Sequence, residues 1–370
     1  MELEFSRDYE VSFEKVIQII TDYQSVLKLM PPQFNGIILE QNEDEVLIEE
    51  TIELSILKTK IKQKSIHKKI TPTLFEINTI SGPVKGSSIN ILVQDIKNKT
   101  KITVKANFNL GLKYRILSSF IKKKYRIVLE QLIDKITGLA LLTDGRDWNE
   151  CTVNNGETLV LSEKYFSLRF DDWWQGDLKQ VFVDETYKKM PFSGKTVVDI
   201  GANIGDSSIY FAVNGAEKVI ALEPFPRNFS VGKKNIINNN LNEKIVFLLS
   251  GCSDKDSIIL VNENNVGTSY GLEKVDKGIA IQTRTLAKIV EEFNIDSAVL
   301  KLDCEGCEYG VILGTPPNVL QKFESVLIEY HHGYLDLEKK LRECGFNTKV
   351  NKNMKPEYAN KGYIFANKIQ

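Results

Sequence analysis

Two glycines four residues apart follow a short apolar run in the middle of the chain. The run spans Thr196 to Ile200 and ends at Gly201, and a new periodic segment begins after Gly205. An apolar run that passes through glycines into a periodic segment is typical of a buried parallel strand that turns into a helix. Because glycine has no Cβ, the backbone of such a loop lets a ligand approach closely. We expect this loop to cradle a small molecule.

An acidic residue ends the next apolar run. Residues 218–222 read as a second strand, and Glu223 follows directly. A carboxylate at this place can accept hydrogen bonds from both hydroxyls of a ribose. The dinucleotide pattern G-x-G-x-x-G and the phosphate-loop pattern G-x-x-x-x-G-K-[ST] are both missing from the sequence. The expected ligand therefore carries a ribose and needs no phosphate, a description that S-adenosylmethionine fits.

Four residues that could accept a proton follow two later apolar runs. Asp303 and Glu305 come after one run, and Glu329 and His331 end the next one. The carboxyl ends of parallel strands meet at one edge of a sheet, so these side chains are expected to converge there. Methyl transfer from a sulfonium mainly requires alignment of the acceptor and removal of its proton. Any of the four could be the catalytic base.

The choice among these four residues stays open at this point. His331 has the most suitable unperturbed pKa, whereas Asp303 is best placed if the strand order follows the expected fold. In a purely structural interpretation, Asp303 and Glu305 cap the following helix and Glu329 pairs with a lysine.

Five short motifs, in this order and at these distances, resemble the FkbM-type methyltransferase family. The resemblance covers roughly residues 195 to 332 and implies S-adenosyl-L-methionine as the cofactor. The motifs are Asp199-Ile200-Gly201-Ala202-Asn203-Ile204-Gly205, Glu223-Pro224-Phe225-Pro226, Thr283-Arg284-Thr285-Leu286, Lys301-Leu302-Asp303-Cys304-Glu305-Gly306 and Ile328-Glu329-Tyr330-His331.

The resemblance also implies a set of cofactor-binding residues. In it, Glu223 binds the ribose, Phe225 stacks on or flanks the adenine, and the loop lines the methionine and adenosine. For two members a structural role is the alternative, because Asp199 could only fix the loop and Gly205 could only permit close packing of helix and sheet. The full set is Asp199, Gly201, Asn203, Gly205, Glu223 and Phe225.

The first part of the chain has a different order of elements. The pattern predicts a strand at 2–11, two short helices, six strands between 34 and 110, and a long amphipathic helix at 114–136. This order resembles the START-like (SRPBCC) helix-grip superfamily over residues 1–137. The resemblance implies an antiparallel sheet around the long C-terminal helix, with an apolar cavity between them.

These observations predict a two-domain protein. Residues 1–137 form the α+β helix-grip ligand-binding domain, 138–150 a linker rich in turn-forming residues, and 151–370 the methyltransferase domain. In the last domain, strands alternate with helices and an antiparallel hairpin ends the chain. This arrangement resembles the α/β class I methyltransferase (Rossmann-like) fold. A helix is expected from about residue 177 to residue 189.

Composition excludes several classes of protein. The 370 residues carry a formal net charge of −1, with too little asymmetry along the chain to indicate nucleic acid as a partner. The sequence holds no apolar run long enough for a transmembrane segment and no signal-peptide pattern at its start, so we expect a cytoplasmic protein. Five cysteines argue against a disulfide framework. Cys304 and Cys307 lack the further ligands of a zinc site, and no metal is expected.

Lysines alternate along two of the predicted N-terminal strands. We interpret them as the solvated face of a half-buried sheet. The alternative is that they join Lys122, Lys123, Lys124 and Arg126 in a patch that contacts anionic lipid headgroups at a membrane surface. The lysines of the strands are Lys58, Lys60, Lys62, Lys64, Lys99, Lys101 and Lys105.

The sequence therefore predicts an S-adenosylmethionine-dependent O-methyltransferase. The expected acceptor is a hydroxyl on a small molecule, a sugar or a lipid-like compound, and the N-terminal domain is expected to bind an apolar substrate. The alternative from another class is a lipid-binding or carrier protein whose methyltransferase domain binds the cofactor without catalysis. An NAD-dependent enzyme is disfavoured because the dinucleotide fingerprint is missing.

Overall fold

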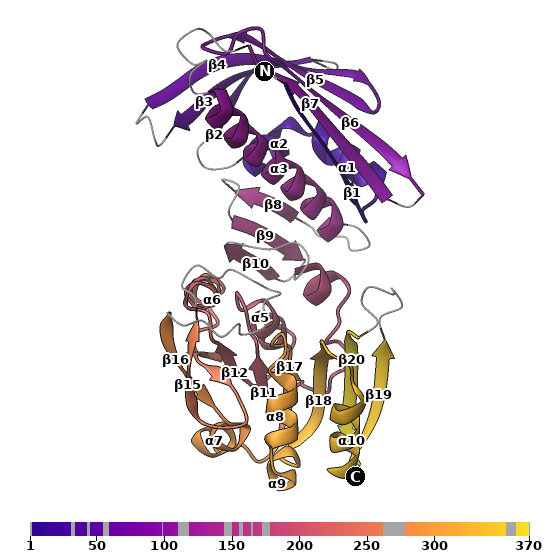
Figure 1. Cartoon of the computed structure of the whole chain (residues 1–370), viewed down its shortest axis with the longest axis vertical. Helices are drawn as coiled ribbons and strands as arrows, with labels where there is room; N and C mark the ends of the chain where they lie inside the picture. The colour runs from indigo at the N-terminus through magenta and orange to yellow at the C-terminus, as the bar shows by residue number, and fades with distance from the viewer. Residues whose placement is uncertain are drawn as a thin grey trace. The chain divides into compact units, whose positions relative to one another are not determined.

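A computed structural model describes residues 2–369 apart from 31–33, 43–44, 55–58, 98, 110–117, 144–149, 155–157, 164–165, 172–177, 262–277 and 353–359. The chain divides into two compact units, Met1–Lys179 and Gln180–Gln370, whose elements are labelled in Figure 1. None of the described helices combines the length and hydrophobicity that crossing a membrane requires.

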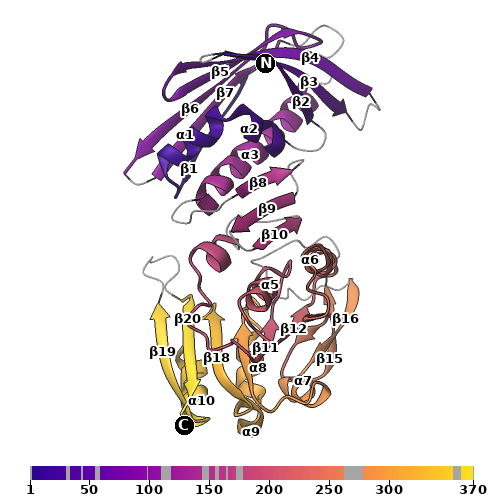
Figure 2. The same cartoon turned by 180° about the vertical axis from the view of Figure 1, so that it is seen from behind.

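The first unit is built around a seven-stranded antiparallel sheet with the strand order β1-β7-β6-β5-β4-β3-β2. Figures 1 and 2 both show the long helix α3 lying along this sheet, with α1 and α2 beside it. A second, three-stranded sheet has the order β10-β9-β8. The elements are β1 (Glu2–Tyr9), α1 (Phe13–Thr21), α2 (Tyr23–Leu29), β2 (Phe34–Gln41), β3 (Glu45–Leu54), β4 (Thr59–Thr71), β5 (Leu74–Ser81), β6 (Ser88–Ile96), β7 (Lys99–Asn107), α3 (Ser118–Thr143), β8 (Glu150–Asn154), β9 (Thr158–Glu163) and β10 (Phe166–Asp171).

Local sequence signals account for much of this unit. The side chain of Ser12 accepts a hydrogen bond from the backbone N–H of Lys15 and caps α1, as its position before the apolar pattern predicts. Val16 and Ile20 form the buried face of this helix. Along the strands, buried and exposed side chains alternate, because every second side chain of a strand faces the core. Strand β7 buries Ile102, Val104 and Ala106.

Helix α3 is longer than the sequence pattern predicts. It continues to Thr143, so the predicted end near residue 136 is wrong and the first part of the predicted linker is helical. The reason is burial, since Leu139, Ala140 and Leu142 are all buried and extend the apolar face beyond Gly138. The domain bounds 1–137, 138–150 and 151–370 stay a prediction.

A polar network is buried on β3 and β4. Oε2 of Glu50 accepts a hydrogen bond from Gln63 at 2.5 Å, and Oε1 accepts one from Ser65 at 2.8 Å. The His67 Nε2 lies 3.1 Å from the Ser65 hydroxyl and 3.5 Å from Glu50. Burial would raise the pKa of Glu50, but the hydrogen bond and charge of His67 and the bonds from Gln63 and Ser65 lower it. The Gln63 Oε1 is buried and has no hydrogen-bond partner among the described residues.

Two lysines of the predicted set, Lys99 and Lys105, form ion pairs. Lys99 lies 3.4 Å from Glu10, and Lys105 lies 3.0 Å from Glu4. These pairs fit a solvated sheet face in which positive and negative side chains oppose each other. Lys58, in the same predicted set, lies outside the described residues.

The second unit is built around a mixed seven-stranded sheet with the order β13-β12-β11-β17-β18-β20-β19. The strands β13, β12, β11, β17 and β18 are parallel, and β20 and β19 add an antiparallel hairpin. A small sheet has the order β14-β16-β15. The elements are η3 (Lys179–Val183), β11 (Thr196–Ile200), α5 (Asp206–Val213), β12 (Lys218–Glu223), α6 (Pro226–Asn238), β13 (Ile245–Leu249), β14 (Gly251–Cys252), β15 (Ser257–Val261), β16 (Ile279–Arg284), α7 (Leu286–Glu292), β17 (Ala298–Leu302), α8 (Glu308–Gly314), α9 (Pro317–Leu320), β18 (Phe323–Tyr330), α10 (Leu335–Glu343), β19 (Phe346–Lys352) and β20 (Gly362–Lys368).

The parallel strands lie close to where the sequence places them, because each is an almost fully apolar run. Strand β17, for example, is buried at every position. The helix expected at 177–189 is wrong, because its described part is the short π-helical segment η3 followed by turns. Phe182 within this segment, and Tyr187 and Phe192 after it, pack on aromatic side chains of α5. Tertiary contacts therefore replace the helical pattern here.

The extension of α3 can be tested by stability. Leu142 is fully buried, whereas Ile127 on the same helix is 38% exposed. We expect Leu142→Ala to lower the free energy of unfolding by about 2–5 kcal/mol, because it leaves a cavity. The matched change Ile127→Ala should cost no more than about 0.5 kcal/mol. Urea denaturation followed by circular dichroism measures both, and similar small effects would contradict a helix that packs up to Thr143.

Candidate functional site

The glycine loop between β11 and α5 adopts an unusual backbone. Gly201, Asn203 and Gly205 all have positive φ angles, of 78°, 46° and 83°. Glycine adopts this conformation easily and asparagine does so more often than most other residues, for which it is rare. A Cβ on Gly201 would lie 1.8 Å from the backbone oxygen of Asp303. The loop is therefore packed directly against the chain that leaves β17.

A buried lysine is hydrogen-bonded to the backbone of this loop. Lys301, on β17, is 1% exposed, and its Nζ donates a hydrogen bond to the carbonyl oxygen of Gly201 at 2.7 Å. The same nitrogen lies 3.1 Å from Oδ1 of Asp199. Burial would lower the pKa of Lys301, but Asp199 and Asp303 outweigh it and raise the pKa above its usual value. The raised pKa favours the charged form of Lys301 beside the loop.

Asp199 is enclosed by protein groups. Its Oδ2 accepts hydrogen bonds from the hydroxyls of Ser207 and Ser208 at 2.7 and 2.6 Å, and its Oδ1 faces Lys301. The side chain is fully buried. These contacts fit the alternative in which Asp199 fixes the loop and the start of α5.

Glu223, at the end of β12, joins two loops. Its Oε2 accepts a hydrogen bond from the backbone N–H of Asn203, and its Oε1 accepts one from the N–H of Phe225, both at 2.9 Å. Burial raises the pKa of Glu223 to about 8, against the opposing effect of these two N–H groups. Phe225 is half-buried and is the N-cap residue of α6. Gly205 begins α5, so the predicted cofactor residues surround the carboxyl ends of β11 and β12.

The predicted catalytic residues also meet at one edge of the sheet. Asp303, Glu329 and His331 each offer one atom, and these atoms all lie within 4.8 Å of one another. The fourth residue, Glu305, places Oε2 3.2 Å from the His331 Nε2. The structure therefore brings the four side chains together at the ends of β17 and β18.

Close packing of these groups shifts their pKa values. Burial, together with the charge of Asp303, raises the pKa of Glu329 to about 7. Burial also raises the pKa of Asp303 and of Glu305, although Lys301 opposes the shift for Asp303 and His331 opposes it for Glu305. For His331, burial would lower the pKa, but the neighbouring carboxylates raise it.

Several residues that orient Glu329 and His331 were not identified from the sequence. Gln180 donates hydrogen bonds to Oε2 of Glu329 at 3.0 Å and to the Tyr363 hydroxyl at 2.6 Å. Buried Glu308 lies 3.0 Å from Nδ1 of His331. Only Lys301 left a recognisable signal, as a lysine inside an otherwise apolar parallel strand.

The turn after β17 carries a disulfide. Cys304 and Cys307 are bonded, with their Cα atoms 5.5 Å apart. The expectation from cysteine usage was a chain without disulfides, so this pair is a correction. The local turn brings the two side chains together, because Glu308 accepts hydrogen bonds from the backbone N–H groups of Cys304 and Gly306 at 3.1 and 2.8 Å. Of the other cysteines, Cys252 and Cys344 are free and buried.

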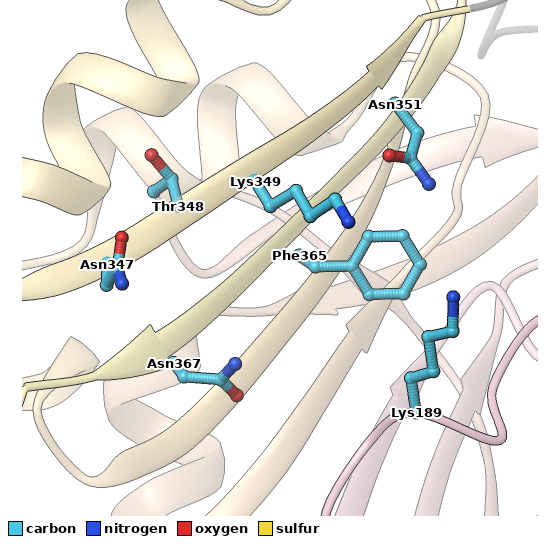
Figure 3. A pocket seen from close by; sticks show the side chains of 7 residues that line it. All are labelled: Lys189, Asn347, Thr348, Lys349, Asn351, Phe365 and Asn367. Carbon is cyan, nitrogen blue, oxygen red and sulfur yellow. The ribbon is translucent and has the colours of Figure 1, made fainter.

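A separate hollow lies over the hairpin of β19 and β20. Its volume is about 200 Å³, and Figure 3 shows the side chains that surround it. None of the predicted site residues lines it. The lining residues are Lys189, Asn347, Thr348, Lys349, Asn351, Phe365 and Asn367.

The order of the strands reverses between β11 and β17. From β11 the chain proceeds to β12 and β13 on one side, whereas β17 and β18 lie on the other side. Open α/β sheets bind ligands in the crevice at such a switch point, outside the carboxyl ends of the strands. Gly201 and Asp303 flank this point and touch each other. The two predicted groups of residues therefore belong to one site.

The contact of Gly201 can be tested against a control glycine. Gly194 has a similar φ of 70°, but a Cβ there would meet nothing within 4 Å. We expect Gly194→Ala to cost about 1–2 kcal/mol through the backbone alone. Gly201→Ala should cost clearly more, because its Cβ overlaps Asp303. Thermal unfolding of both variants gives the comparison, and equal losses would contradict the close packing of the two loops.

The raised pKa of Glu223 predicts that the free energy of unfolding depends on pH. Its pKa is 4.5 as a free side chain and about 8 in the fold. The folded state therefore holds the extra proton between these values, and the stabilisation present below pH 4.5 is lost as the pH rises through 8. The slope is at most about 1.4 kcal/mol per pH unit. Glu223→Gln should flatten it in urea denaturation between pH 5 and 8, whereas the exposed control Glu243→Gln should not. An unchanged slope would contradict the raised pKa.

Comparison with known proteins shows similarity to methyltransferases. Residues 199–348 match the family described as Methyltransferase FkbM domain. The ribosomal protein L11 methyltransferase of Carboxydothermus hydrogenoformans is 37% identical over 82 residues, which are 21% of this chain and 27% of that protein. The chain thus aligns with only about a quarter of this curated relative.

Solved structures resemble the N-terminal part of the chain. The Zhui aromatase/cyclase from Streptomyces sp. R1128 covers 39% of this chain and 94% of its own, with 12% identity and a TM-score of 0.33. A START superfamily protein from Mycobacterium smegmatis covers 38% of this chain and 96% of its own, with 13% identity and a TM-score of 0.32.

The match includes the glycine loop, Glu223 and the acidic edge around Asp303 and Glu329. Residues 199–348 are therefore similar to the FkbM methyltransferase domain.

Proposed function

We propose that this protein is an S-adenosylmethionine-dependent O-methyltransferase with a class I (Rossmann-like) catalytic domain. The observation that carries the proposal is the position of Glu223, which is buried at the carboxyl end of β12 and bonded to the N–H groups of Asn203 and Phe225. Each carboxylate oxygen has a second lone pair with which it can accept a ribose hydroxyl. The glycine loop beside it lets the cofactor approach the backbone.

The reaction itself is an in-line displacement. The acceptor hydroxyl loses its proton, a bond forms between its oxygen and the methyl carbon, and the carbon–sulfur bond breaks to release S-adenosylhomocysteine. Asp303, Glu305, Glu329 and His331 are the groups from which the base is drawn, because they converge next to the cofactor loop. Alignment supplies most of the remaining acceleration.

Negative charge at this edge also suits the cofactor. The sulfonium and amino groups of S-adenosylmethionine are cationic, and the edge carries Asp303, Glu305 and Glu329. Lys301 does not cancel this charge fully, because it is 4.0 Å from Asp303 and closer to Asp199 and the Gly201 carbonyl. Opposite charges in a partly buried site attract each other strongly.

For the N-terminal unit we propose binding of a small, mainly apolar molecule that the methyltransferase unit modifies. The support is the buried polar network on β3 and β4, with the Gln63 Oε1 that lacks a partner among the described residues. A hydroxyl on the ligand would satisfy this oxygen. The acceptor would then be a lipid-like or polyketide-like hydroxyl compound, and nucleic acid is not proposed as a partner.

Isothermal titration calorimetry with S-adenosylmethionine tests the cofactor assignment. Full-length protein should bind the cofactor, and Glu223→Ala should weaken binding about tenfold, because both ribose hydroxyls lose a hydrogen-bond acceptor worth about 0.5–1.5 kcal/mol per bond. The exposed control Glu243→Ala should bind like the wild type. An absence of heat with the wild type, or equal affinity in Glu223→Ala, would overturn the assignment.

A further inference from the structure

The acidic edge contains a donor set of mixed chemistry. Asp303 leaves the end of β17, and Glu329 and His331 lie at the end of β18, so two neighbouring parallel strands supply two carboxylates and one imidazole. Their nearest donor atoms lie within 4.8 Å of one another. Carboxylate oxygens with one imidazole nitrogen suit first-row divalent ions such as Mn²⁺, Fe²⁺ and Zn²⁺.

His331 is held as metal-binding histidines are held. Its Nδ1 lies 3.0 Å from Oε1 of Glu308, a fully buried carboxylate. Glu308 cannot turn freely, because it also accepts backbone hydrogen bonds from Cys304 and Gly306. A carboxylate on Nδ1 fixes the ring and favours the tautomer whose Nε2 carries a lone pair. That Nε2 lies 3.2 Å from Oε2 of Glu305, so a bound ion would take the place of a proton shared between the ring and this carboxylate.

Groups outside the donor set also fix Glu329. Gln180 donates to its Oε2, and the Tyr363 hydroxyl hydrogen-bonds to the same carboxylate. Oriented second partners of this kind are common around metal ligands. Neither Gln180 nor Tyr363 carries a positive charge, so the two residues orient the carboxylate without neutralising it.

The balance of charge points to a missing cation. Asp303, Glu305, Glu308 and Glu329 surround a single imidazole. Lys301 contacts Asp199 at 3.1 Å and the Gly201 carbonyl at 2.7 Å, and it stays 4.0 Å from Asp303. The charge of Lys361 acts on Glu305 and lowers its pKa, but burial outweighs it. Like charges at such distances repel in a buried site unless a counter-ion lies between them.

We propose that Asp303, Glu329 and His331 bind a divalent first-row transition-metal ion at the acceptor side of the site. This departs from the sequence analysis, which expected no metal. Within the proposed methyltransferase function, on which this role rests, the ion would hold the acceptor hydroxyl and promote loss of its proton to solvent water. The oxygen would then attack the methyl carbon as described above.

Mn²⁺ alone is the probe for this site. Full-length protein stripped with EDTA is titrated with Mn²⁺ at pH 8, and loss of the free-ion signal in electron paramagnetic resonance measures binding. We expect one tight site in the wild type. Glu329→Gln should weaken binding at least tenfold, since it removes a charged ligand and keeps the shape of the side chain. His331→Gln should do the same, and circular dichroism verifies that each variant is folded.

The neighbouring His332 provides a matched control. It is exposed and its ring lies against Tyr309, so His332→Gln should bind Mn²⁺ like the wild type. Absence of Mn²⁺ binding by the wild type at millimolar concentration, or equal binding by Glu329→Gln, would overturn the metal site.

Titration with S-adenosylmethionine keeps the two proposals separate. If the cofactor binds and Mn²⁺ does not, the metal site is wrong and the methyltransferase proposal stands. If Mn²⁺ binds through Glu329 and the cofactor does not bind, the metal site stands and the cofactor assignment fails.

Discussion

The site depends on one buried cation. Lys301 joins the Asp199 carboxylate to the carbonyl of Gly201, and so ties β17 to the start of the glycine loop. A lone buried ammonium would be costly, but here each of its neighbours is a negative or partly negative oxygen. Removing the side chain of either Lys301 or Asp199 would leave the other one as an uncompensated charge in the core. The same contact sets the spacing between the loop and Asp303.

From that contact, the geometry of both halves of the site follows. Gly201 lies against the Asp303 backbone, and this closeness requires the absence of a Cβ. On one side, Glu223 connects the loop to the segment that begins α6. On the other side, the turn after β17 presents Asp303 and Glu305 to His331. The predicted cofactor-binding residues and the predicted catalytic residues therefore meet at the strand switch point, because the two loops share one packing contact.

Buried charged groups are stabilised by different partners in the two compact units. In the second unit, buried carboxylates surround Lys301 and His331, and they raise the pKa of both groups. In the first unit, Glu50 is satisfied by neutral donors and by His67, so that burial does not prevent its ionisation. Among the described residues of the first unit, only the Gln63 Oε1 is buried without a hydrogen-bond partner. It marks the place where that network could accept one more donor.

Local patterns determined the parallel strands, the glycine loop and the cap of α1. They could do so because each depends on a few consecutive residues, such as the apolar run 196–200 or Ser12 before its helix. The convergence of Asp303, Glu329 and His331 was also expected, because the ends of parallel strands meet at one edge.

Only the tertiary structure decided the remaining features, since each depends on a neighbour far away in the sequence. Gln180 reaches Glu329 across 149 residues, and Lys301 reaches Gly201 across 100. The last turns of α3 are helical because other residues bury them, although Gly138 reads locally as a break. Periodicity reports which face of a segment is apolar, but it does not report what that face or a polar side chain will meet.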